Sequence, residues 1–106
     1  MIEVGYLLGF YGGMLTDRQQ ALLDAYYNQD LSLSEIAQQE GISRQGVHDA
    51  IRRGEQELRN LEERLGFAAN HQCMRGKLLS AKSALASGNS KEAMTLLNEL
   101  IQSWED

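Results

Sequence analysis

The chain has 106 residues and a net charge of −5, which suits one small domain or one domain with a helical extension. It has no proline and a single cysteine, Cys73, so an intramolecular disulfide framework is excluded. No Cys/His cluster has zinc-ligand spacing and no glycine-rich phosphate loop occurs, so we predict no metal and no cofactor. Apolar residues recur at spacings of three and four, which predicts an all-α fold.

The apolar N-terminal stretch, residues 1–15, is shorter than the ~18 residues that a membrane span needs, and it has no basic leader. We therefore predict a cytoplasmic protein with no membrane insertion. Val4, Leu7, Leu8, Tyr11 and Leu15 have the spacing of one helical face. Because interior glycines weaken a helix by roughly 1 kcal/mol each, we expect a marginal helix that tertiary contacts or a partner hold in place.

Two capping boxes follow, each placed just before an apolar run with helical periodicity. Thr16 with Gln19 predicts a helix that begins near residue 17, and Ser32 with Glu35 predicts a helix that begins near residue 33. The sequence leaves Tyr27 free to lie in the core or at the surface. We expect the first of these helices to bury three apolar side chains, those of Leu22, Leu23 and Tyr26.

The stretch 33–53 predicts two short helices joined by a tight turn. Gly41 can adopt the left-handed conformation that ends the first helix, and Ser43 can cap the second through its hydroxyl. Val47 and Ile51 fall one turn apart on the inner face of that second helix. A glycine in the turn followed by these apolar positions is the helix-turn-helix pattern, although an ordinary helical hairpin can also carry such features.

The second helix of this motif is predicted to continue well beyond the length that DNA binding requires, until Gly66 ends it. Its apolar positions are spaced by four and three, a heptad pattern that either the other helices or a second copy of the chain must cover. Gly54 in this seam indicates either a close helix crossing or a mild kink, and Glu55 and Arg59 are spaced for an i,i+4 ion pair. The seam consists of Val47, Ile51, Gly54, Leu58, Leu61 and Leu65.

The remaining sequence predicts two further helices separated by Gly88 and Asn89, with Ser90 as the cap of the second. This hairpin can pack on the helix-turn-helix or on a partner. We therefore predict a helix-turn-helix domain at 1–65, with a three- to four-helix core and a long recognition helix, and a C-terminal helical hairpin extension at 66–106. The expected inner positions are Met74, Leu78, Ala81 and Leu85 in one helix and Ala93, Leu97, Leu100 and Trp104 in the other.

The exposed face of the predicted recognition helix is the candidate DNA-binding site. Residues 43–53 carry three arginines and one aspartate, whereas residues 1–31 carry one basic and four acidic residues. Because phosphate contacts supply most non-specific affinity for DNA, a thin basic patch on an acidic chain predicts weak, salt-sensitive binding. Each arginine can also be an ordinary solvated charge. The candidate residues are Ser43, Arg44, Gln45, His48, Asp49, Arg52 and Arg53.

No motif indicates catalysis, and we predict that the protein is not an enzyme. Neither His48 nor His71 has a serine, cysteine or aspartate partner at a recognisable catalytic spacing. Glu62 and Glu63, followed by an arginine, fit a solvated helix face better than a catalytic carboxylate pair.

Several phrases of the sequence, taken together, are similar to known helix-turn-helix families. LTDRQ, EIAQQEGIS and VHDAIRR resemble the C-terminal promoter-reading domain of bacterial sigma factors. LLGFYGGMLTDRQ, the Tyr26-Tyr27 pair and SRQGVHDAIRR more closely resemble the YlxM-type family of small bacterial helix-turn-helix proteins. The second resemblance covers residues 4–65 well and the C-terminal hairpin in length and helical character only.

The resemblance implies a sigma-factor-like helix-turn-helix fold and a regulatory role, without a catalytic residue or ligand. Genes of the YlxM-type family commonly neighbour the gene of the signal-recognition-particle GTPase, which implies a link to that protein-targeting pathway. The chain departs from the family at two positions, with Gly46 in place of a common alanine and His48 in place of a usual tyrosine. Gly46 is expected to loosen the recognition helix by about 1 kcal/mol.

These observations predict a DNA-binding regulatory protein whose partner is duplex DNA. The alternative is a protein- or ribonucleoprotein-interaction module that keeps the fold without sequence-specific DNA recognition, with signal-recognition-particle RNA or protein as its partner. The acidic balance and the long apolar seam favour this alternative. We also predict a homodimer, because palindromic operators pair with dimeric proteins and because the seam and Trp104 offer apolar surface.

Overall fold

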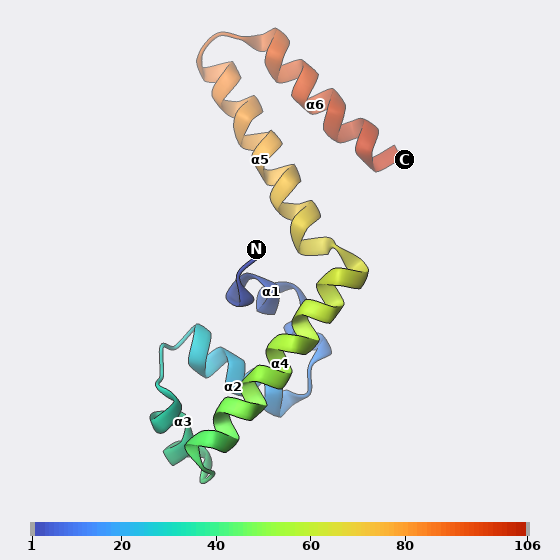
Figure 1. Cartoon of the computed structure of the whole chain (residues 1–106). Helices are drawn as coiled ribbons and strands as arrows, with labels where there is room; N and C mark the ends of the chain where they lie inside the picture. The colour runs from blue at the N-terminus through green and yellow to red at the C-terminus, as the bar shows by residue number, and fades with distance from the viewer. Residues whose placement is uncertain (1, 106) are drawn as a thin grey trace. The chain divides into compact units, whose positions relative to one another are not determined.

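The computed structural model describes residues 2–105, and every regular element in this range is helical (Figure 1). The predicted all-α fold is therefore confirmed. The chain divides into two compact units, Met1–Ala68 and Ala69–Asp106. Across the described range, no helix combines the length and apolarity that crossing a membrane requires. The elements are α1 (Val4–Tyr11), the short 3-10 helix η1 (Gly12–Met14), α2 (Asp17–Tyr27), α3 (Leu33–Glu40), α4 (Arg44–Leu65), α5 (Phe67–Ala86) and α6 (Ser90–Glu105).

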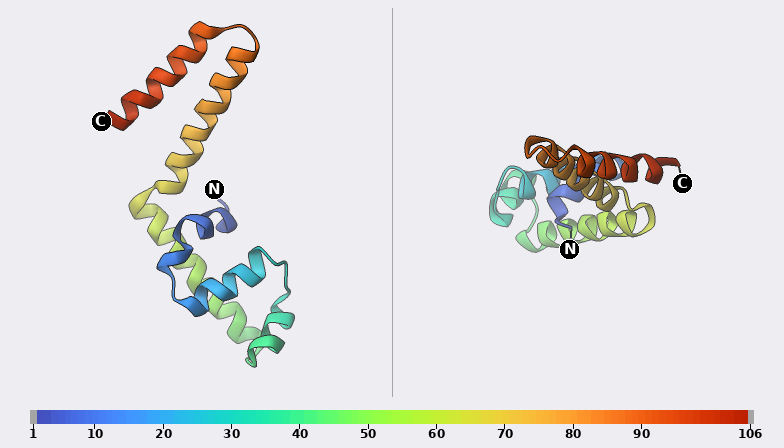
Figure 2. Two further views of the ribbon diagram at one scale, coloured as in Figure 1. Left: turned by 180° about the vertical axis from the view of Figure 1, so that it is seen from behind. Right: turned by 90° about the horizontal axis from the view of Figure 1, so that it is seen from above.

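Helix α4 organises the first unit, because α1, α2 and α3 all contact it and lie along one side of it (Figures 1 and 2). The predicted heptad face points into this core, where Val47 and Leu58 are fully buried. The chain's own helices cover the seam from Val47 to Leu61, whereas Leu65, its last predicted position, is 40% exposed. The core consists of Leu7, Leu8, Tyr11, Leu15, Leu22, Leu23, Ile36, Ala37, Val47, Ile51, Leu58, Leu61 and Ala68.

Helices α2 and α4 approach closely at Gly54. A Cβ atom at this position would lie 2.7 Å from Cδ1 of Leu23, which is fully buried. Of the two interpretations of Gly54 that the sequence allowed, the close crossing is therefore the correct one.

Both predicted capping boxes are present. Thr16 Oγ1 accepts the Gln19 N–H at 3.1 Å, and Gln19 Oε1 accepts the Thr16 N–H at 3.2 Å. Ser32 and Glu35 form the same reciprocal pair at 3.1 Å in each direction. Because each box pairs N–H groups that the first turn of a helix leaves free, α2 and α3 begin where the sequence predicts.

The N-terminal helix is short and depends on the rest of the unit. It ends at Tyr11, and the chain then makes the tight turn η1 before Leu15 re-enters the core. Leu7 and Leu8 are buried against the unit, and Arg59 of α4 donates to the Ile2 carbonyl at 2.8 Å. Tertiary contacts thus hold this glycine-rich helix, in agreement with the expectation of a marginal helix.

Tyr11 and Glu62 together cap the start of α5. The Tyr11 hydroxyl donates to Glu62 Oε1 at 2.6 Å and accepts the Phe67 N–H at 3.0 Å. The same Glu62 oxygen accepts the Ala68 N–H at 3.0 Å. Two N–H groups of the first turn are thus paired, and a carboxylate lies at the positive end of the helix dipole. Glu62 is therefore half-buried and structural, which corrects its assignment to a solvated face.

The second unit is a hairpin in which α5 and α6 run antiparallel (Figure 2). Gly88 adopts φ 81° in the turn, and Asn89 rather than the predicted Ser90 caps α6, because Asn89 Oδ1 accepts the Glu92 N–H at 3.1 Å. Two of the predicted inner positions of α5, Leu78 and Leu85, are half-exposed. Trp104, predicted as an inner position of α6, is 69% exposed. Of the expected inner positions, Ala81, Ala93 and Leu100 are buried, and Ala84 is buried in addition.

Candidate nucleic-acid interface

Helix α3, a short turn and the start of α4 form the helix-turn-helix. Gly41 has φ 68° and ψ 31°, the left-handed conformation that ends α3. The N–H of the next residue, Ile42, donates to the Ala37 carbonyl at 3.2 Å. Ser43 then caps α4, because its Oγ accepts the Gly46 N–H at 2.9 Å. The roles predicted for Gly41 and Ser43 are confirmed.

The absence of a side chain at Gly46 leaves room for this cap. A Cβ atom there would lie 3.1 Å from Ser43 Oγ, which is tighter than an ordinary van der Waals contact. An alanine at this position would therefore crowd the hydroxyl that caps the helix. Glycine lowers the helix propensity, but it avoids this close contact.

The inner face of α4 fixes the orientation of its outer face. Val47 is fully buried and Ile51 is 4% exposed, one turn apart, and Gly54 touches Leu23 one turn further on. With three successive turns packed against α2 and α3, the helix cannot rotate about its axis without breaking the core. The side chains between these positions are consequently held outward.

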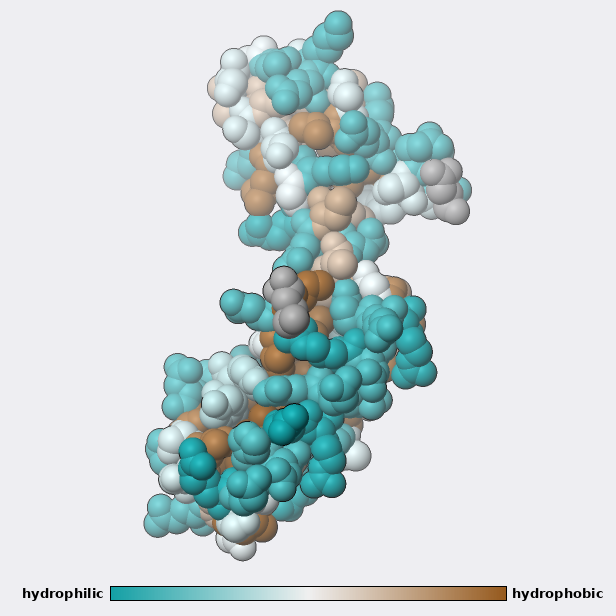
Figure 3. Space-filling model, viewed as in Figure 1, coloured by the Kyte–Doolittle hydropathy of each residue, from teal (hydrophilic) through white to brown (hydrophobic). Residues whose placement is uncertain are grey.

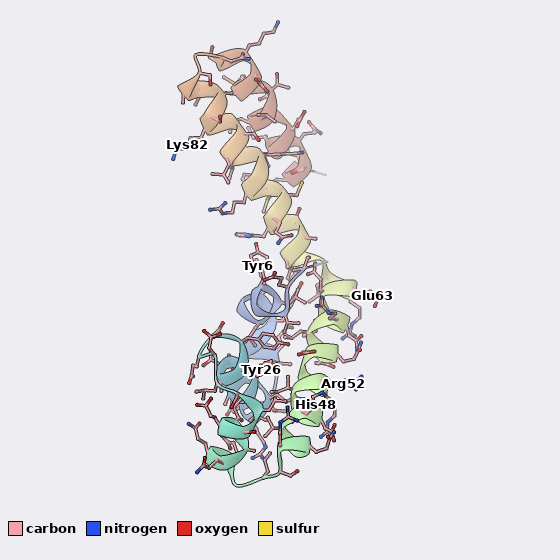
Figure 4. The ribbon with its side chains drawn as sticks, turned by 60° about the vertical axis from the view of Figure 1, so that its left-hand side comes forward. Tyr6, Tyr26, His48, Arg52, Glu63 and Lys82 are labelled. Atoms are coloured by element: carbon pink, nitrogen blue, oxygen red, sulfur yellow. The ribbon has the colours of Figure 1, made fainter. Side chains whose placement is uncertain are left out.

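Three arginines dominate the outer face. Arg44, Arg52 and Arg53 are exposed, and none of them forms a hydrogen bond or ion pair with any residue in the range 2–105. Figure 4 shows His48 and Arg52 one turn apart on this part of α4. Arg52 and Arg53 line the same shallow hollow, whereas Arg44, in the first turn of α4, lies about 180° around the helix from Arg53. The guanidinium groups of all three are free to meet an anion.

Asp49, the acidic residue of this face, is engaged by its neighbours. Gln45 Nε2 donates to Asp49 Oδ1 at 2.9 Å. Nδ1 of His48 lies 3.6 Å from the same oxygen, too far for a hydrogen bond, and has no hydrogen-bond partner within the described chain. The bond from Gln45 uses one of its two amide hydrogens, so its other hydrogen and its Oε1 remain for a base edge.

A shallow hollow continues the outer face along α4 beyond the predicted site. It adds Gln56, one turn after Arg52, which the sequence argument did not include although the same helical spacing would have placed it there. The residues that line this hollow are Asp49, Arg52, Arg53, Glu55, Gln56 and Arg59.

The predicted i,i+4 ion pair between Glu55 and Arg59 is not formed in the described structure. Glu55 accepts a hydrogen bond from the Tyr27 hydroxyl, and Arg59 donates to the Ile2 carbonyl. Tyr27 is half-buried against the core, whereas Tyr26, which we expected to be buried, is 36% exposed. Glu55 and Arg59 thus each form a hydrogen bond with a group outside α4, and these two hydrogen bonds attach α4 to the rest of the unit.

A protein-family model with the description "Putative helix-turn-helix protein, YlxM / p13 like" matches residues 1–99. The chain belongs to this family, UPF0122. The resemblance to the YlxM-type family is thereby confirmed.

Curated relatives in the family come from several bacteria. A UPF0122 protein of Symbiobacterium thermophilum is 55% identical over 70 residues, which cover 66% of this chain and 65% of the relative. A UPF0122 protein of Desulforamulus reducens is 48% identical over 67 residues, covering 63% of this chain and 57% of the relative. These two matches thus span less than two thirds of the relatives' length. One from Shouchella clausii is 37% identical over 101 residues, covering 95% of this chain and 93% of the relative.

Alkaline pH is expected to loosen the attachment of α4. Burial raises the pKa of Tyr27, and the hydrogen bond to Glu55 raises this pKa further. Burial and the hydrogen bond to Glu62 likewise raise the pKa of Tyr11. Because the fold favours the neutral phenols, this stabilisation is complete below the unfolded pKa of about 10 and is lost as the pH rises towards the folded values.

The measurement is urea denaturation between neutral pH and pH 11 (roughly one unit above the unfolded tyrosine pKa), with tyrosinate absorbance recorded in parallel. Tyr27→Phe removes the titrating hydroxyl and should make the loss of stability above about pH 10 less steep than in the wild type. An identical pH dependence in the two proteins would show that Tyr27 ionisation is not coupled to folding.

Proposed function

We propose that this protein is a DNA-binding regulator that inserts the N-terminal half of α4 into the major groove of duplex DNA. The observation that carries the proposal is the exposed surface of the N-terminal half of α4, where three arginines have no partner among residues 2–105 and the inner face of the helix is held in the core. A helix-turn-helix presents its second helix to DNA in this manner.

Each candidate residue has a role that its position on α4 permits. Arg44, in the first turn, contacts a guanine edge or a phosphate, whereas Arg52 and Arg53, two turns later, meet phosphate. Gln45 contacts adenine through its other amide hydrogen and its Oε1, and Asp49 can accept a hydrogen bond from the amino group of cytosine.

Two further candidates lie at the edge of this face. Ser43 already uses its oxygen to cap α4, but its hydroxyl proton remains available to a phosphate oxygen. His48 is half-buried next to Asp49 and contributes at the border of the contact.

The charge of the first unit limits the affinity. Residues 1–68 contain six arginines and eleven carboxylates, a net charge of −5, whereas residues 69–106 contain four basic and four acidic residues. Repulsion between the acidic body and phosphate leaves only the outer face of α4 favourable for DNA. We therefore expect binding that is clearest at low salt and falls steeply as salt rises.

The direct test is binding of a labelled mixed-sequence duplex, measured by fluorescence anisotropy at several salt concentrations. Arg44→Ala/Arg52→Ala is expected to weaken binding at least about tenfold at low salt and to lower the salt slope by about 2, because two phosphate contacts are lost. The matched control is Arg75→Ala/Lys82→Ala, which removes the same charge from exposed positions of α5 and should leave binding nearly unchanged.

Three outcomes would contradict the proposal. The first is that the wild type does not bind the duplex even at low salt. The second is that the arginine variant binds as tightly as the wild type. The third is that the control variant loses as much affinity as the arginine variant. The third result would mean that net charge alone, and not the face of α4, determines the interaction.

A second candidate function is the interaction module, which the acid excess of residues 1–68 favours. In that case the same face binds the RNA or the GTPase of the signal recognition particle. The same assay, with that RNA or that GTPase in place of the duplex, distinguishes the two functions: binding of either with no binding of DNA supports the second.

The regulatory proposal includes a homodimer, because helix-turn-helix proteins that recognise palindromic sites bind as two-fold symmetric pairs. The seam of α4 from Val47 to Leu61 is buried within the unit, and Leu65 alone is too small a surface for a specific contact. The contact must therefore come from another surface.

A further inference from the structure

The second unit has very little core of its own. It comprises residues 69–106, and its buried cluster is Ala81, Ala84 and Ala93, with Leu96 and Leu97 partly buried against it and Leu100 also buried. Burial of three alanine side chains removes little apolar area from water. Folded units below about 40 residues usually need disulfides, metals or oligomerisation, and a lone exposed cysteine supplies no disulfide within this unit.

The larger apolar residues of α5 lie beside the packed side of the helix. Ala81 and Ala84 mark the side that packs against α6. Leu78 and Leu85, three residues before and four residues after Ala81, fall on one flank of that side. Leu79 points to the opposite side of the helix, at 140–160° from both alanines by the helical repeat of about 100° per residue.

Helix α6 carries a matching flank. Met94 follows Ala93 by one residue and lies about 100° around the helix from it. Ile101 follows Ala93 by eight residues and lies about 80° around the helix from it, on the same side as Met94. Because α6 runs antiparallel to α5, this flank lies on the same side of the hairpin as Leu78 and Leu85. Apolar surface is visible among the hydrophilic residues of this unit in Figure 3. We call the set Leu78, Leu85, Met94 and Ile101, together with Trp104 at the end of α6, the hairpin face.

The hairpin face is large enough for a stable contact between two copies. Its side chains correspond to roughly 600 Å² of accessible surface per copy, so pairing would bury about 1,200 Å², the lower end of the range for specific interfaces. Neighbouring residues on the rim add to this area. The exposed fractions are 50% for Leu78, 57% for Leu85, 59% for Met94, 49% for Ile101 and 69% for Trp104.

The charges of the hairpin also permit pairing. Residues 69–106 have no net charge, with four basic and four acidic residues, whereas residues 1–68 carry −5. Two first units would repel each other, but two hairpins would not, and a net charge near zero favours association. Lys77 and Glu99 already neutralise each other within the hairpin at 3.7 Å.

We propose that the hairpin face binds the hairpin face of a second copy of this chain. The contact is isologous, with each helix pair covering the other to form a four-helix arrangement that buries the apolar side chains of both. This inference rests on the homodimer included in the proposed function and assigns its surface. It makes no use of DNA, so the two can fail separately.

The test is the mass of the full-length protein in sedimentation equilibrium without DNA, over about 1–100 µM, a range that brackets a micromolar dissociation constant. We expect a reversible dimer for the wild type. Leu78→Lys should raise the dissociation constant at least about tenfold, because two-fold symmetry places the charge in the interface twice. Leu79→Lys is the matched control: the two leucines are adjacent and equally exposed, and the control should dimerise as the wild type does.

A second variant and a spectroscopic measurement guard against misfolding. Ile101→Lys, on α6, should weaken the dimer as Leu78→Lys does, and far-UV circular dichroism should show unchanged helix content in each variant. Trp104 is the only tryptophan in the chain, so a shift of its emission to shorter wavelength as concentration rises would report burial of the hairpin face.

Three results would overturn the inference: a wild-type monomer throughout this range, a dimer that Leu78→Lys leaves intact, or equal weakening by Leu78→Lys and Leu79→Lys. A dimer that shows these variant effects but binds no duplex would support the hairpin face and contradict the DNA-binding proposal instead.

Discussion

Leu58→Ala is expected to lower the free energy of unfolding by about 2–5 kcal/mol, a large part of the stability of a small domain. Leu58 is fully buried in the centre of α4, within the core formed with α1, α2 and α3. Truncation removes its apolar contacts and leaves a cavity that the surrounding helices can close only in part. Urea denaturation followed by far-UV circular dichroism measures the effect.

Leu85→Ala is the matched control, because Leu85 occupies the same kind of position in the apolar repeat of α5. It is 57% exposed in the single chain, so the same truncation should change the stability of the monomer by no more than about 0.5 kcal/mol. The comparison is made at a concentration where the protein is monomeric, and Trp104 fluorescence follows the second unit separately. If Leu58→Ala and Leu85→Ala lowered the free energy of unfolding equally, the distinction between a buried apolar repeat in α4 and an exposed one in α5 would be wrong.

Gly54→Leu is expected to destabilise the protein by about 3 kcal/mol through overpacking. A Cβ atom at this position would lie 2.7 Å from Cδ1 and 3.3 Å from Cγ of Leu23. Leu23 is fully buried, so it has no free space into which it can move. Helices α2 and α4 must therefore separate to admit the new side chain. Urea denaturation and the helix content of the folded variant measure this change.

The control for Gly54→Leu is Gly76→Leu in α5, where a Cβ atom would have no neighbour within 4 Å. Leucine has a better helix propensity than glycine, so this variant should gain up to about 0.8 kcal/mol. If Gly54→Leu were also neutral or stabilising, glycine would be unnecessary at the crossing, and the mild kink would become the better explanation of its presence.

The local structure of the first unit follows from short-range chemistry in the sequence. The caps at Thr16, Ser32 and Ser43 act on N–H groups three residues away, and Gly41 acts on its own dihedral angles. Such interactions are complete within one turn of helix, so a pattern in the sequence is sufficient to predict them. The same local character placed Gln45, Asp49 and Arg52 on one side of α4, since helical periodicity alone groups these three positions.

Burial could not be predicted in the same way. Leu58 and Leu85 have equivalent positions in repeats of the same spacing, yet one is fully buried and the other is 57% exposed. Spacing specifies that an apolar face exists, whereas burial requires other elements whose surfaces fit it. Three N-terminal helices fit the seam of α4, while α6 packs on the alanines of α5 and leaves Leu78 and Leu85 exposed.

The sequence by itself therefore determined the all-α fold, the caps of α2, α3 and α4 and the helix-turn-helix, because these depend on neighbours within about four residues along the chain. Only the tertiary structure decided the partners of the long side chains. Glu55 and Arg59 have the spacing of an ion pair, but Tyr27 and the Ile2 carbonyl, distant in the sequence, bind them instead. A hydrogen bond to a group held in place by the core costs less side-chain entropy than an exposed ion pair between two flexible chains, so the distant partners prevail.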